Sequence, residues 1–424
     1  MSGQAGRGSF SRPDFGRLGI MAVLGFSSGL PWALSGPTLR YWMSGEHVPL
    51  GMIGLTANIG LAYLLKFVWA PFFDEAKPFF FGRRRGWLIP VQIALALAIA
   101  ALALSDPGQD IWLTLGLGAL VAFLSASQDI IIDAWRIEAF APNLQGAALA
   151  CEVWGWRVAY QVSNAGVIAL SIGLGWHGAF GLMAVLALLG PLAVLFAPEP
   201  QVAREAHPAG LASRFTQAVR EPLQEFLGRR GIAVIIGFIV LFRLGGALGG
   251  TMLAPYYTAL GFDRAHIAVA NGPLSLVCGI AGTGLGGLLV MRIGVGRALL
   301  FTALLQVAAL CLYPVLGLYP HLPYILLIIS AVEAFTDAFS DTAFLSYLSG
   351  LCHPEHTATQ YALLSSLAPL ALHTIAGASG FLAARTGLVS FFVICAFAAL
   401  PGIALLLVIL RFYPPKKDMP SGSA

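Results

Sequence analysis

A series of long apolar runs limits what this chain can fold into, because each run has about the 20 residues that a helix needs to cross a bilayer. Charged residues make up only 10% of the chain and hydrophobic residues 58%, whereas soluble domains carry about 25% charged residues. The sequence therefore predicts an all-α integral membrane protein with twelve transmembrane helices and no soluble domain. The runs lie at 18–40, 50–72, 87–105, 111–135, 145–170, 177–197, 231–258, 266–291, 298–317, 323–350, 358–384 and 388–411.

The runs divide into two sets of six, separated by the most polar segment of the chain. We predict an N-terminal six-helix bundle at 1–197, a cytoplasmic linker at 198–230, and a C-terminal six-helix bundle with a short tail at 231–424. Within the linker, 211–227 is either an amphipathic helix on the inner membrane face or plain connecting chain. Two sets of equal size indicate an internal repeat, with pseudo-symmetric bundles.

Carboxylates inside an apolar run are costly and therefore informative. Asp129 and Asp133 lie in the inner half of 111–135, where each carboxylate costs ~2.5–3.5 kcal/mol on insertion scales. They project from one helix face with Gln128 beside them, since four residues turn only ~40°. Either basic residues on neighbouring helices neutralise the two acids and fix the packing, or the acids line a watered pathway and carry protons. The second interpretation is favoured, because intramembrane acids are usually functional.

The same pattern recurs in the second half of the chain. A-S-Q-D-I-I-I-D-A-W at 126–135 aligns with S-A-V-E-A-F-T-D-A-F at 330–339. Asp341 follows one helical turn later. Each half is therefore predicted to carry an acidic helix face at a corresponding place. The alignment pairs Asp129 with Glu333 and Asp133 with Asp337.

Basic residues also fall inside apolar runs, namely Lys66, Arg157 and Arg243. Lys66 either reaches the membrane surface with its long side chain or pairs with Asp129 or Asp133. Arg157 lies more than two turns inside its run, and we expect it to bind an anion or pair with an acid. Arg243 is expected to face the acids of 330–341. Because intramembrane acids outnumber these bases, some acids remain free to take up protons.

Basic residues outside the runs set the orientation of a membrane protein. Nearly all of them fall in the N-terminal segment, in the loops on the same side, and in the C-terminal tail, whereas Arg264 and Arg385 fall on the other side. Both termini are therefore predicted to be cytoplasmic. The net charge of +4 reflects this asymmetry and gives no reason to expect a nucleic-acid partner.

Two further segments predict local geometry. G-F-S-S-G-L-P-W-A-L-S-G-P at 25–37 predicts a bent helix with a close backbone neighbour, because it holds three glycines and two prolines. F-G-R-R-R-G-W at 81–87 is a cytoplasmic turn whose arginines determine topology. We also expect the arginines to gate the conformation by pairing with Asp74, Glu75 or the end of another helix. They are Arg83, Arg84 and Arg85.

Motifs of other protein classes are missing from the sequence. The five cysteines are scattered without C-x-x-C spacing, and the histidines form no metal-binding set. There is no Walker A sequence and no G-x-S-x-G nucleophile motif. We expect no enzyme activity, no cofactor and no metal, and an ion gradient, most simply of protons, as the energy source for any uphill work.

The chain resembles the AmpG-type muropeptide permeases of the major facilitator superfamily. The resemblance rests on five segments in order: 25–31, 81–87, 125–135, G-F-D at 261–263 and T-A-T-Q-Y-A-L-L-S at 357–365. It implies two six-helix bundles with helices one, four, seven and ten around a central cavity. It also implies proton-driven import of N-acetylglucosaminyl-1,6-anhydro-N-acetylmuramyl peptides across the inner membrane of a Gram-negative bacterium, for cell-wall recycling.

The resemblance assigns roles to the residues above. Protonation of the helix-four acids would change which state of a rocking pair of bundles is favoured. Tryptophans are expected as surfaces for sugar rings, with Trp32, Trp42, Trp154 and Trp156 as candidates. The expected proton-coupling residues are Asp129, Asp133, Glu333 and Asp337. The expected substrate contacts are Gln128, Lys66, Arg157, Arg243, Tyr63 and Trp154.

The sequence departs from the family pattern in two places. Helix seven reads R-L-G-G, with Gly246 where the family carries an acid, and helix ten carries Asp337 and Asp341 where the pattern is small and uncharged. These departures favour, as an alternative, a permease of the same fold for another solute, such as a siderophore or an acyl-CoA-like molecule. A third alternative, a non-transporting membrane sensor or membrane enzyme, lacks an output domain and a catalytic constellation. We expect the protein to work as a monomer in the bilayer.

Overall fold

The computed structural model describes residues 12–75, 78, 81–141, 144–200, 231–320, 322–351, 369 and 373–413. These residues form helices joined by short turns, without a strand among them. The expected amphipathic segment 211–227, the side chains of Asp74 and Glu75, and the segment 357–365 lie outside what the structure describes. The all-helical prediction is confirmed for the described residues.

The helices of the first half follow the predicted runs, with shifted ends. The fourth is longer than expected, since α7 continues to Ala139, and the first continues through α2 to Gly45. They are α1 (Arg12–Ser35), α2 (Pro37–Gly45), α3 (Leu50–Leu55), η1 (Thr56–Gly60), α4 (Leu61–Leu65), η2 (Lys66–Val68), α5 (Ala70–Glu75), α6 (Arg83–Leu104), α7 (Ile111–Ala139), α8 (Gln145–Gln161), η3 (Val162–Gly166), α9 (Val167–Ala187) and α10 (Leu189–Phe196).

The second half repeats the arrangement. Its fourth helix, α18, has 29 residues, as does α7 in the first half. The described elements are α12 (Ile232–Leu241), α13 (Leu244–Ala259), α14 (Arg264–Val269), η4 (Ala270–Leu274), α15 (Ser275–Ile293), α16 (Val295–Leu310), α17 (Leu312–Leu318), α18 (Pro323–Leu351), α20 (Ser379–Thr386) and α21 (Leu388–Phe412).

Within the described residues, nine helical stretches are long and apolar enough to cross a membrane. One of them, Ala147–Phe196, contains two of the predicted runs, because the chain reverses at Gly175, whose φ of 66° is left-handed. The second predicted run is divided into short helices, of which Leu50–Leu65 is the apolar part. The eleventh run is described only at 369 and from 373 onward.

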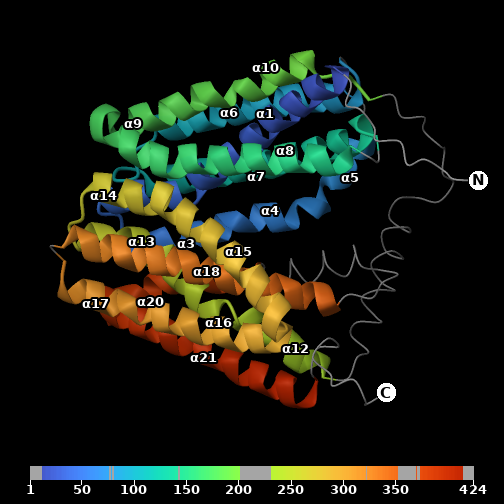
Figure 1. The fold of residues 1–424 in the computed structure, drawn as a ribbon. Coiled ribbons are helices and arrows are strands. Elements are labelled where there is room, and N and C mark those ends of the chain that lie inside the picture. Colours follow the sequence, from blue (N-terminus) through green and yellow to red (C-terminus); the bar gives the residue numbers. More distant parts are fainter. Residues whose placement is uncertain are drawn as a thin grey trace, which may run out of the picture.

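The helices form two bundles that lie side by side (Figure 1). In the first, α1 packs on α8 and α7, and α6 packs on α7 and α9. In the second, α15 and α16 pack on α18, and α12 and α13 pack on α21. This is the two-bundle architecture that the sequence predicts.

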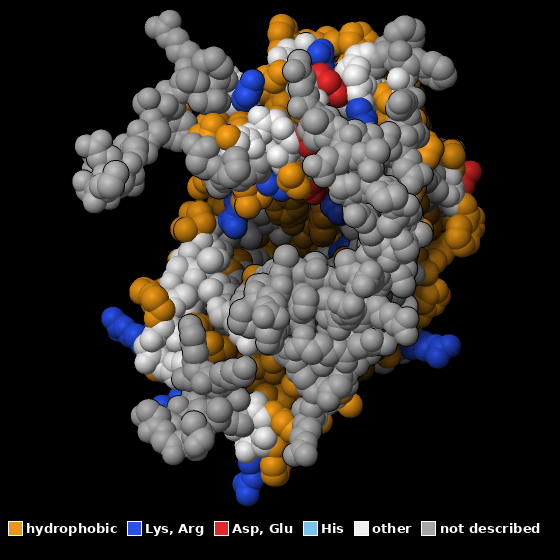
Figure 2. Space-filling model, turned by 90° about the vertical axis from the view of Figure 1, so that its right-hand side faces the viewer, with side chains coloured by type: hydrophobic (Ala, Val, Ile, Leu, Met, Phe, Trp, Pro, Cys, Tyr) orange, Lys and Arg blue, Asp and Glu red, His pale blue; other side chains and the backbone are white. Residues whose placement is uncertain are grey.

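The bundles meet at the end of the molecule opposite the start of α1. There α2 packs on α13, α3 on α20, and α9 on α14. At the other end the bundles separate, and Figure 2, which looks onto that end, shows a hollow between them with Lys, Arg and acidic side chains at its rim. We call this hollow the central cavity; it is closed at one end and open at the other.

Glycines let α1 and α8 approach closely. A Cβ at Gly29 would meet the backbone of Trp156, one at Gly25 the carbonyl of Glu152, and one at Gly155 the carbonyl of Ala22. Pro31 lies inside α1, and the helix ends at Ser35 before α2 begins at Pro37. The predictions of a bend and of a close backbone neighbour are therefore confirmed.

Candidate functional site

The first acid of α7 is held by α1. Ser28 Oγ donates a hydrogen bond to Asp129 Oδ1 at 2.7 Å. Next to it, Gln128 Nε2 donates to the carbonyl of Ser27 at 2.8 Å, and Gln128 is 0% exposed. Gln128 therefore fastens α7 to α1 in this conformation and has no surface in the cavity, whereas Asp129 is only half-buried.

The second acid of α7 begins a chain of alternating charges across three helices. Lys66 Nζ lies 3.8 Å from Asp133 Oδ2, which confirms the expected interior partner of Lys66. A guanidinium nitrogen of Arg136 lies 3.2 Å from Asp133 Oδ1, and Arg136 Nε lies 2.7 Å from Glu152 Oε2. Because the Asp133 side chain is still 44% exposed, this chain of charges reaches an accessible surface.

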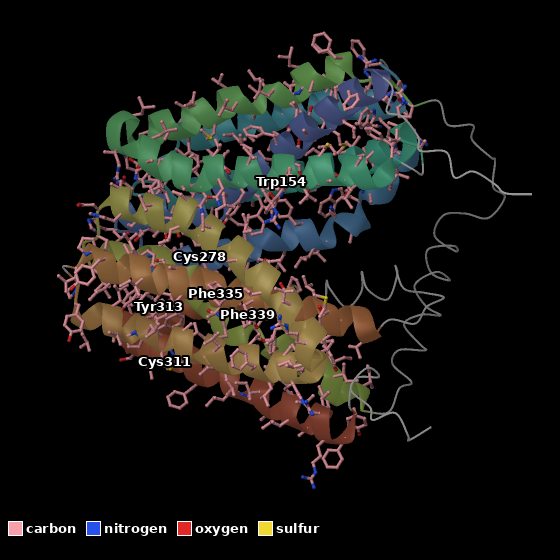
Figure 3. The ribbon with its side chains drawn as sticks, in the orientation of Figure 1. Trp154, Cys278, Cys311, Tyr313, Phe335 and Phe339 are labelled. Carbon is pink, nitrogen blue, oxygen red and sulfur yellow. The ribbon has the colours of Figure 1, made fainter. Side chains whose placement is uncertain are left out.

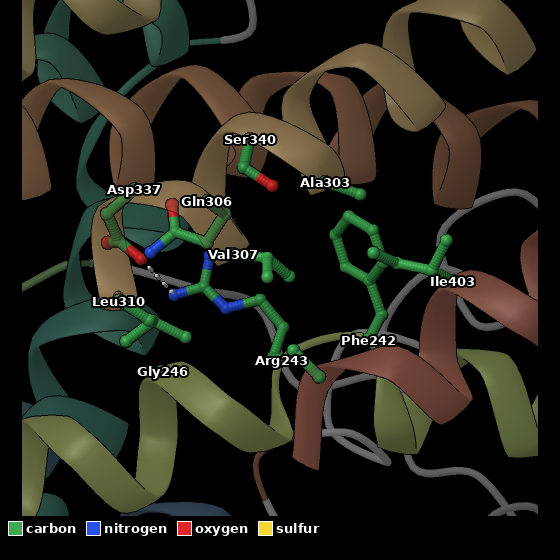
Figure 4. Close-up of a pocket in the computed structure, with 11 residues that line it drawn as sticks. Phe242, Arg243, Gly246, Ala303, Gln306, Val307, Leu310, Asp337, Ser340 and Ile403 are labelled. Carbon is green, nitrogen blue, oxygen red and sulfur yellow. Dashed lines mark ion pairs between the residues drawn. The ribbon is translucent and has the colours of Figure 1, made fainter. Parts of the chain in front are cut away.

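The acids of α18 surround one arginine. Arg243, between α12 and α13, lies 3.2 Å from Asp337 Oδ1 and also forms an ion pair with Asp341. Figure 4 shows Arg243 directed toward Asp337 in a pocket that Gln306 and Gly246 also line. The side chains of Asp337 and Asp341 are 38% and 42% exposed, so both carboxylates remain accessible. The expectation that Arg243 faces the helix-ten acids is confirmed.

Glu333 differs from the other acids of α18. It is half-buried, and among the residues that the structure describes no ion pair or side-chain hydrogen bond is formed by its carboxylate. It lies one turn before Asp337, within electrostatic range of Asp337 and Arg243. Each acidic helix thus presents an acid that forms no ion pair with the residues described here and, one turn later, a paired one: Asp129 and Asp133 on α7, Glu333 and Asp337 on α18.

Four aromatic side chains from three helices form an aromatic cluster, which we define as Trp32, Tyr63, Trp156 and Tyr160. The Trp32 ring lies 6.0 Å from that of Tyr63, 6.4 Å from that of Trp156 and 6.3 Å from that of Tyr160. Trp156 and Tyr160 are stacked at 5.5 Å with an angle of 8° between their planes. All four side chains are half-buried. Trp32, Tyr63 and Trp156 are among the candidates predicted from the sequence, whereas Tyr160 and the meeting of the four rings are not.

Two other expected tryptophans lie elsewhere. Trp42 is 1% exposed and packs on Trp176 and Phe180 in the core, so the expectation that it offers a surface to a sugar is wrong for this conformation. Trp154 is 62% exposed, midway along α8 (Figure 3). Two residues turn a helix by about 200°, so Trp154 and Trp156 lie on opposite faces of α8.

Arg157 lies on the exposed face of α8. It is exposed, and within the described part of the chain it forms no ion pair or side-chain hydrogen bond. Glu152, on the same helix, pairs with Arg136. Arg136 had been assigned only a role in topology, because it lies just past the end of the predicted run.

The arginine turn ties three helix ends together. Arg83 and Arg84 both pair with Glu138 at the end of α7, each at 2.6 Å. The amides of Arg84 and Arg85 donate to the Glu199 carboxylate at 2.9 and 3.1 Å, and the Arg85 guanidinium donates to carbonyls at the end of α10. The sequence left open whether these arginines pair with Asp74, with Glu75 or with the end of another helix. In the structure they contact the ends of α7 and α10. Gly82 enables the turn with a φ of 82°.

Sequence reasoning missed a polar group at the closed end of the cavity. Arg40 Nε donates to Thr56 Oγ1 at 3.0 Å, and its guanidinium donates to the carbonyl of Gly250 in the other bundle at 3.4 Å. Asn271 Nδ2 donates to Tyr41 Oη at 2.7 Å, also across the bundles. Arg40 is the last residue of the predicted run 18–40, and only the continuation of the helix through α2 places it inside the span.

Among the described residues, no group of three or more His, Cys, Asp or Glu side chains is placed to hold a metal ion. The titratable side chains of the cavity instead form acid–base pairs across helices. Such pairs exchange protons and bind ionic groups of a solute. The arrangement fits transport of a polar solute better than it fits catalysis.

Comparison with known proteins agrees with this geometry. Residues 21–319 match the family model of the Major Facilitator Superfamily. The chain is 37% identical over 396 residues to the anhydromuropeptide permease of Escherichia coli (strain K12), a match that covers 92% of this chain and 79% of that protein. Among solved structures, it resembles a nucleoside transporter, NupG (TM-score 0.71, 12% identity, 93% and 98% of the two chains), and a D-xylose–proton symporter (TM-score 0.68, 14% identity, 95% and 98%).

The fold and the family match define a multi-pass membrane transporter, not an enzyme. The solved structures share the fold at low identity and say nothing of the solute. The permease from Escherichia coli is similar over nearly the whole chain. The chain belongs to the AmpG-type muropeptide permeases of the Major Facilitator Superfamily.

Proposed function

We propose that this protein imports anhydromuropeptides, the N-acetylglucosaminyl-1,6-anhydro-N-acetylmuramyl peptides of cell-wall turnover, by proton symport. The observation that carries the proposal is the 37% identity to an anhydromuropeptide permease over 92% of the chain. The central cavity supports it, because a large solute with sugars, amides and carboxylates needs aromatic surfaces and charged groups together, and both line this cavity.

We further propose that the protein lies in a bacterial inner membrane with both termini in the cytoplasm. The arginine turn and Arg136 are at the open end of the cavity, the end at which α1 begins, and basic residues favour the cytoplasmic side. In this orientation the conformation described here is open to the cytoplasm and closed to the periplasm. We expect the protein to work as a monomer, with bundles at 1–197 and 231–424 and a linker at 198–230.

Protons are proposed to act through the acids of both bundles. Asp129 accepts a hydrogen bond from a serine, and Glu333 forms no ion pair among the described residues. A proton can therefore bind to either carboxylate without breaking an ion pair. Asp133 pairs with Lys66 and Arg136, and Asp337 shares Arg243 with Asp341, in ion pairs that a proton would weaken. Proton uptake at any of these sites reduces the excess negative charge of the cavity and so favours an anionic solute.

Substrate binding is proposed for Lys66, Arg157, Arg243, Tyr63, Trp154 and Gln128. Arg243 is the strongest candidate for a carboxylate, since a guanidinium binds carboxylates with two parallel hydrogen bonds. In this conformation two nitrogens of the Arg243 guanidinium pair with Asp337 and Asp341, so a substrate carboxylate must displace one of these acids. Gln128, which is fully buried here, would contact substrate only in another conformation.

The arginine turn is proposed as a gating element. Its contacts with Glu138 and Glu199 join α6, α7 and α10 into one body at the cytoplasmic end. Such a joined end moves as a unit when the bundles rock. We propose the same role for Asp74, at the end of α5.

The second candidate is a permease of the same fold for another solute. One observation favours it. Gly246, which stands where the family carries an acid, lines the pocket beside Arg243, and a Cβ there would meet nothing within 4 Å. Asp337 and Asp341 supply the carboxylates to Arg243 from α18 instead, so the binding surface differs from the family pattern at this point.

Uptake into vesicles tests the proposal. Purified protein in proteoliposomes is supplied with radiolabelled anhydromuropeptide, with and without an imposed inward proton gradient. Accumulation that depends on the gradient supports both substrate and coupling. Uptake that only equilibrates would contradict proton symport, and no uptake by folded, correctly oriented protein would favour the second candidate.

A further inference from the structure

We propose that the aromatic cluster, and within it chiefly Trp32, Trp156 and Tyr160, is the surface on which the sugar rings of the substrate stack, while the charged peptide lies against α18 of the other bundle. The inference rests on the proposed function, since it assumes a substrate with sugar rings and a charged chain. It adds where each part of that substrate binds.

The cluster is not ordinary core. Large core aromatics of the first bundle, such as Trp42 and Trp135, are 1% exposed, whereas all four rings of the cluster keep exposed surface. Burial of an exposed ring is favourable, and the bundle that packs Trp42 and Trp135 so completely leaves these four rings partly open. A ligand that covers them would gain that free energy.

The cluster faces the other bundle. The helix that carries Trp156 and Tyr160 continues as η3, which packs on α14 and η4 of the second bundle. On the other side of Trp32, Tyr63 lies within electrostatic range of Asp129. The cluster therefore lies on a helix that runs to the contact between the bundles.

This combination fits a carbohydrate. One face of a pyranose ring presents C–H groups and its edge presents hydroxyls, so a sugar site needs flat aromatic faces flanked by polar groups. The stacked Trp156 and Tyr160 rings, only 8° from parallel, and the edge-on Trp32 ring at 77° to Trp156 form a corner of two aromatic walls. Asn164 Nδ2, 3.4 Å from Tyr160 Oη, holds the tyrosine hydroxyl at its border.

The backbone fixes this corner. A Cβ at Gly29 would overlap the backbone of Trp156, so the backbones of α1 and α8 are in direct contact one helical turn before Trp32 in the sequence. Rings held by packed backbones lose little conformational entropy on binding, which increases affinity. The opposite wall has a different chemistry, because Arg243 and three acids line it. The ionic groups of the peptide can pair with these charged side chains, whereas the aromatic wall offers ring faces.

The test compares two ligands and three variants of the purified full-length protein. The ligands are the radiolabelled peptide-free anhydro-disaccharide and the same disaccharide with its peptide. Trp156→Leu is expected to weaken binding of both ligands by the same factor, about tenfold, as for loss of an aromatic contact. Trp112→Leu, the matched control, changes a 66% exposed tryptophan at the start of α7 and should change neither affinity more than about twofold. Asp337→Asn should change the affinity for the peptide-bearing ligand and leave that for the disaccharide unaltered.

Each other outcome decides against the inference. It is wrong if Trp156→Leu binds the disaccharide as the wild type does, or if Trp112→Leu weakens binding equally. The proposed orientation is wrong if Asp337→Asn changes both affinities alike or neither. If Trp156→Leu fails to fold, Trp156→Tyr keeps a smaller ring against Tyr160 and should bind both ligands about threefold more weakly. Failure of the proposed function is distinguishable, because then the wild type itself binds neither ligand.

Discussion

Replacement of Asp129 by asparagine removes the charge of the carboxylate and keeps its shape. Asp129 Oδ1 accepts a hydrogen bond from Ser28 Oγ at 2.7 Å, and an amide oxygen in the same place can accept it too. A hydrogen bond to a charged group contributes about 1.5–3 kcal/mol and a neutral one about 0.5–1.5 kcal/mol. We therefore expect a loss of stability of about 1 kcal/mol, which leaves folding and membrane level intact.

The expected effect on transport is larger. A gradient of one pH unit is worth about 1.4 kcal/mol per proton, enough to sustain about tenfold accumulation of a solute that moves with one proton. Without a protonatable group at position 129, accumulation in proteoliposomes should fall to equal concentrations on both sides. Exchange of labelled for unlabelled substrate at equal pH should continue, since it needs the cavity and not the gradient.

Two control variants make this assay specific. Asp106→Asn changes an exposed carboxylate that bonds the amide of Gly108 in a loop, and it should accumulate substrate like the wild type. Ser28→Ala removes the hydrogen bond and keeps the carboxylate, so it should still accumulate. The reasoning is refuted if Asp129→Asn retains tenfold accumulation, or if folded protein with this change loses exchange together with accumulation.

The remaining predictions concern packing and the closed end of the cavity. Gly155→Val would place side-chain atoms on the carbonyl of Ala22 and push α1 from α8; we expect a loss of about 1–3 kcal/mol, measured as a lower Tm in detergent. Arg264 stacks on Trp176 at 4.9 Å and donates to the carbonyl of Ser171 at 3.1 Å across the bundles. Arg264→Ala should therefore increase the population open at that end by about 5–30-fold, measured from distances between spin labels on α2 and α13.

Matched controls exist for both changes. A Cβ at Gly173 would meet nothing within 4 Å, so Gly173→Val should leave the Tm close to that of the wild type. Arg385 is an exposed arginine at the same end as Arg264, and Arg385→Ala should leave the label distances unchanged. Equal effects of test and control variants would contradict the packing argument in the first case and the cross-bundle contact in the second.

Much of the site followed from residue type and helical spacing. An intramembrane base requires an acid within reach, and this alone paired Lys66 with one of two acids and Arg243 with those of α18. The structure chose Asp133 for Lys66, and both Asp337 and Asp341 for Arg243. The choice depended on how far each helix is rotated about its axis, which the periodicity of an apolar run does not fix.

Helix ends were the weaker part of the sequence prediction. Arg136 lies beyond the predicted end of the fourth run, so it was assigned to the cytoplasmic surface, yet it lies within α7 and pairs with two acids. Arg40, at the predicted end of the first run, is carried inside by α2. Hydropathy falls gradually where charges begin, so it cannot distinguish a residue just inside a helix from one just outside.

Composition and spacing alone predict that this chain crosses a membrane many times, that it has two related halves, and that acids and bases lie within its spans. They do so because a bilayer accepts long apolar helices and strongly penalises charges within them. The packing of the helices was needed to show that Trp156 and not Trp154 joins Trp32, and that the cavity closes at one end through contacts such as that of Asn271 with Tyr41. Those choices depend on the rotation and crossing of helices, which arise from close contacts such as Gly29 against Trp156 and leave no periodic signal in the chain.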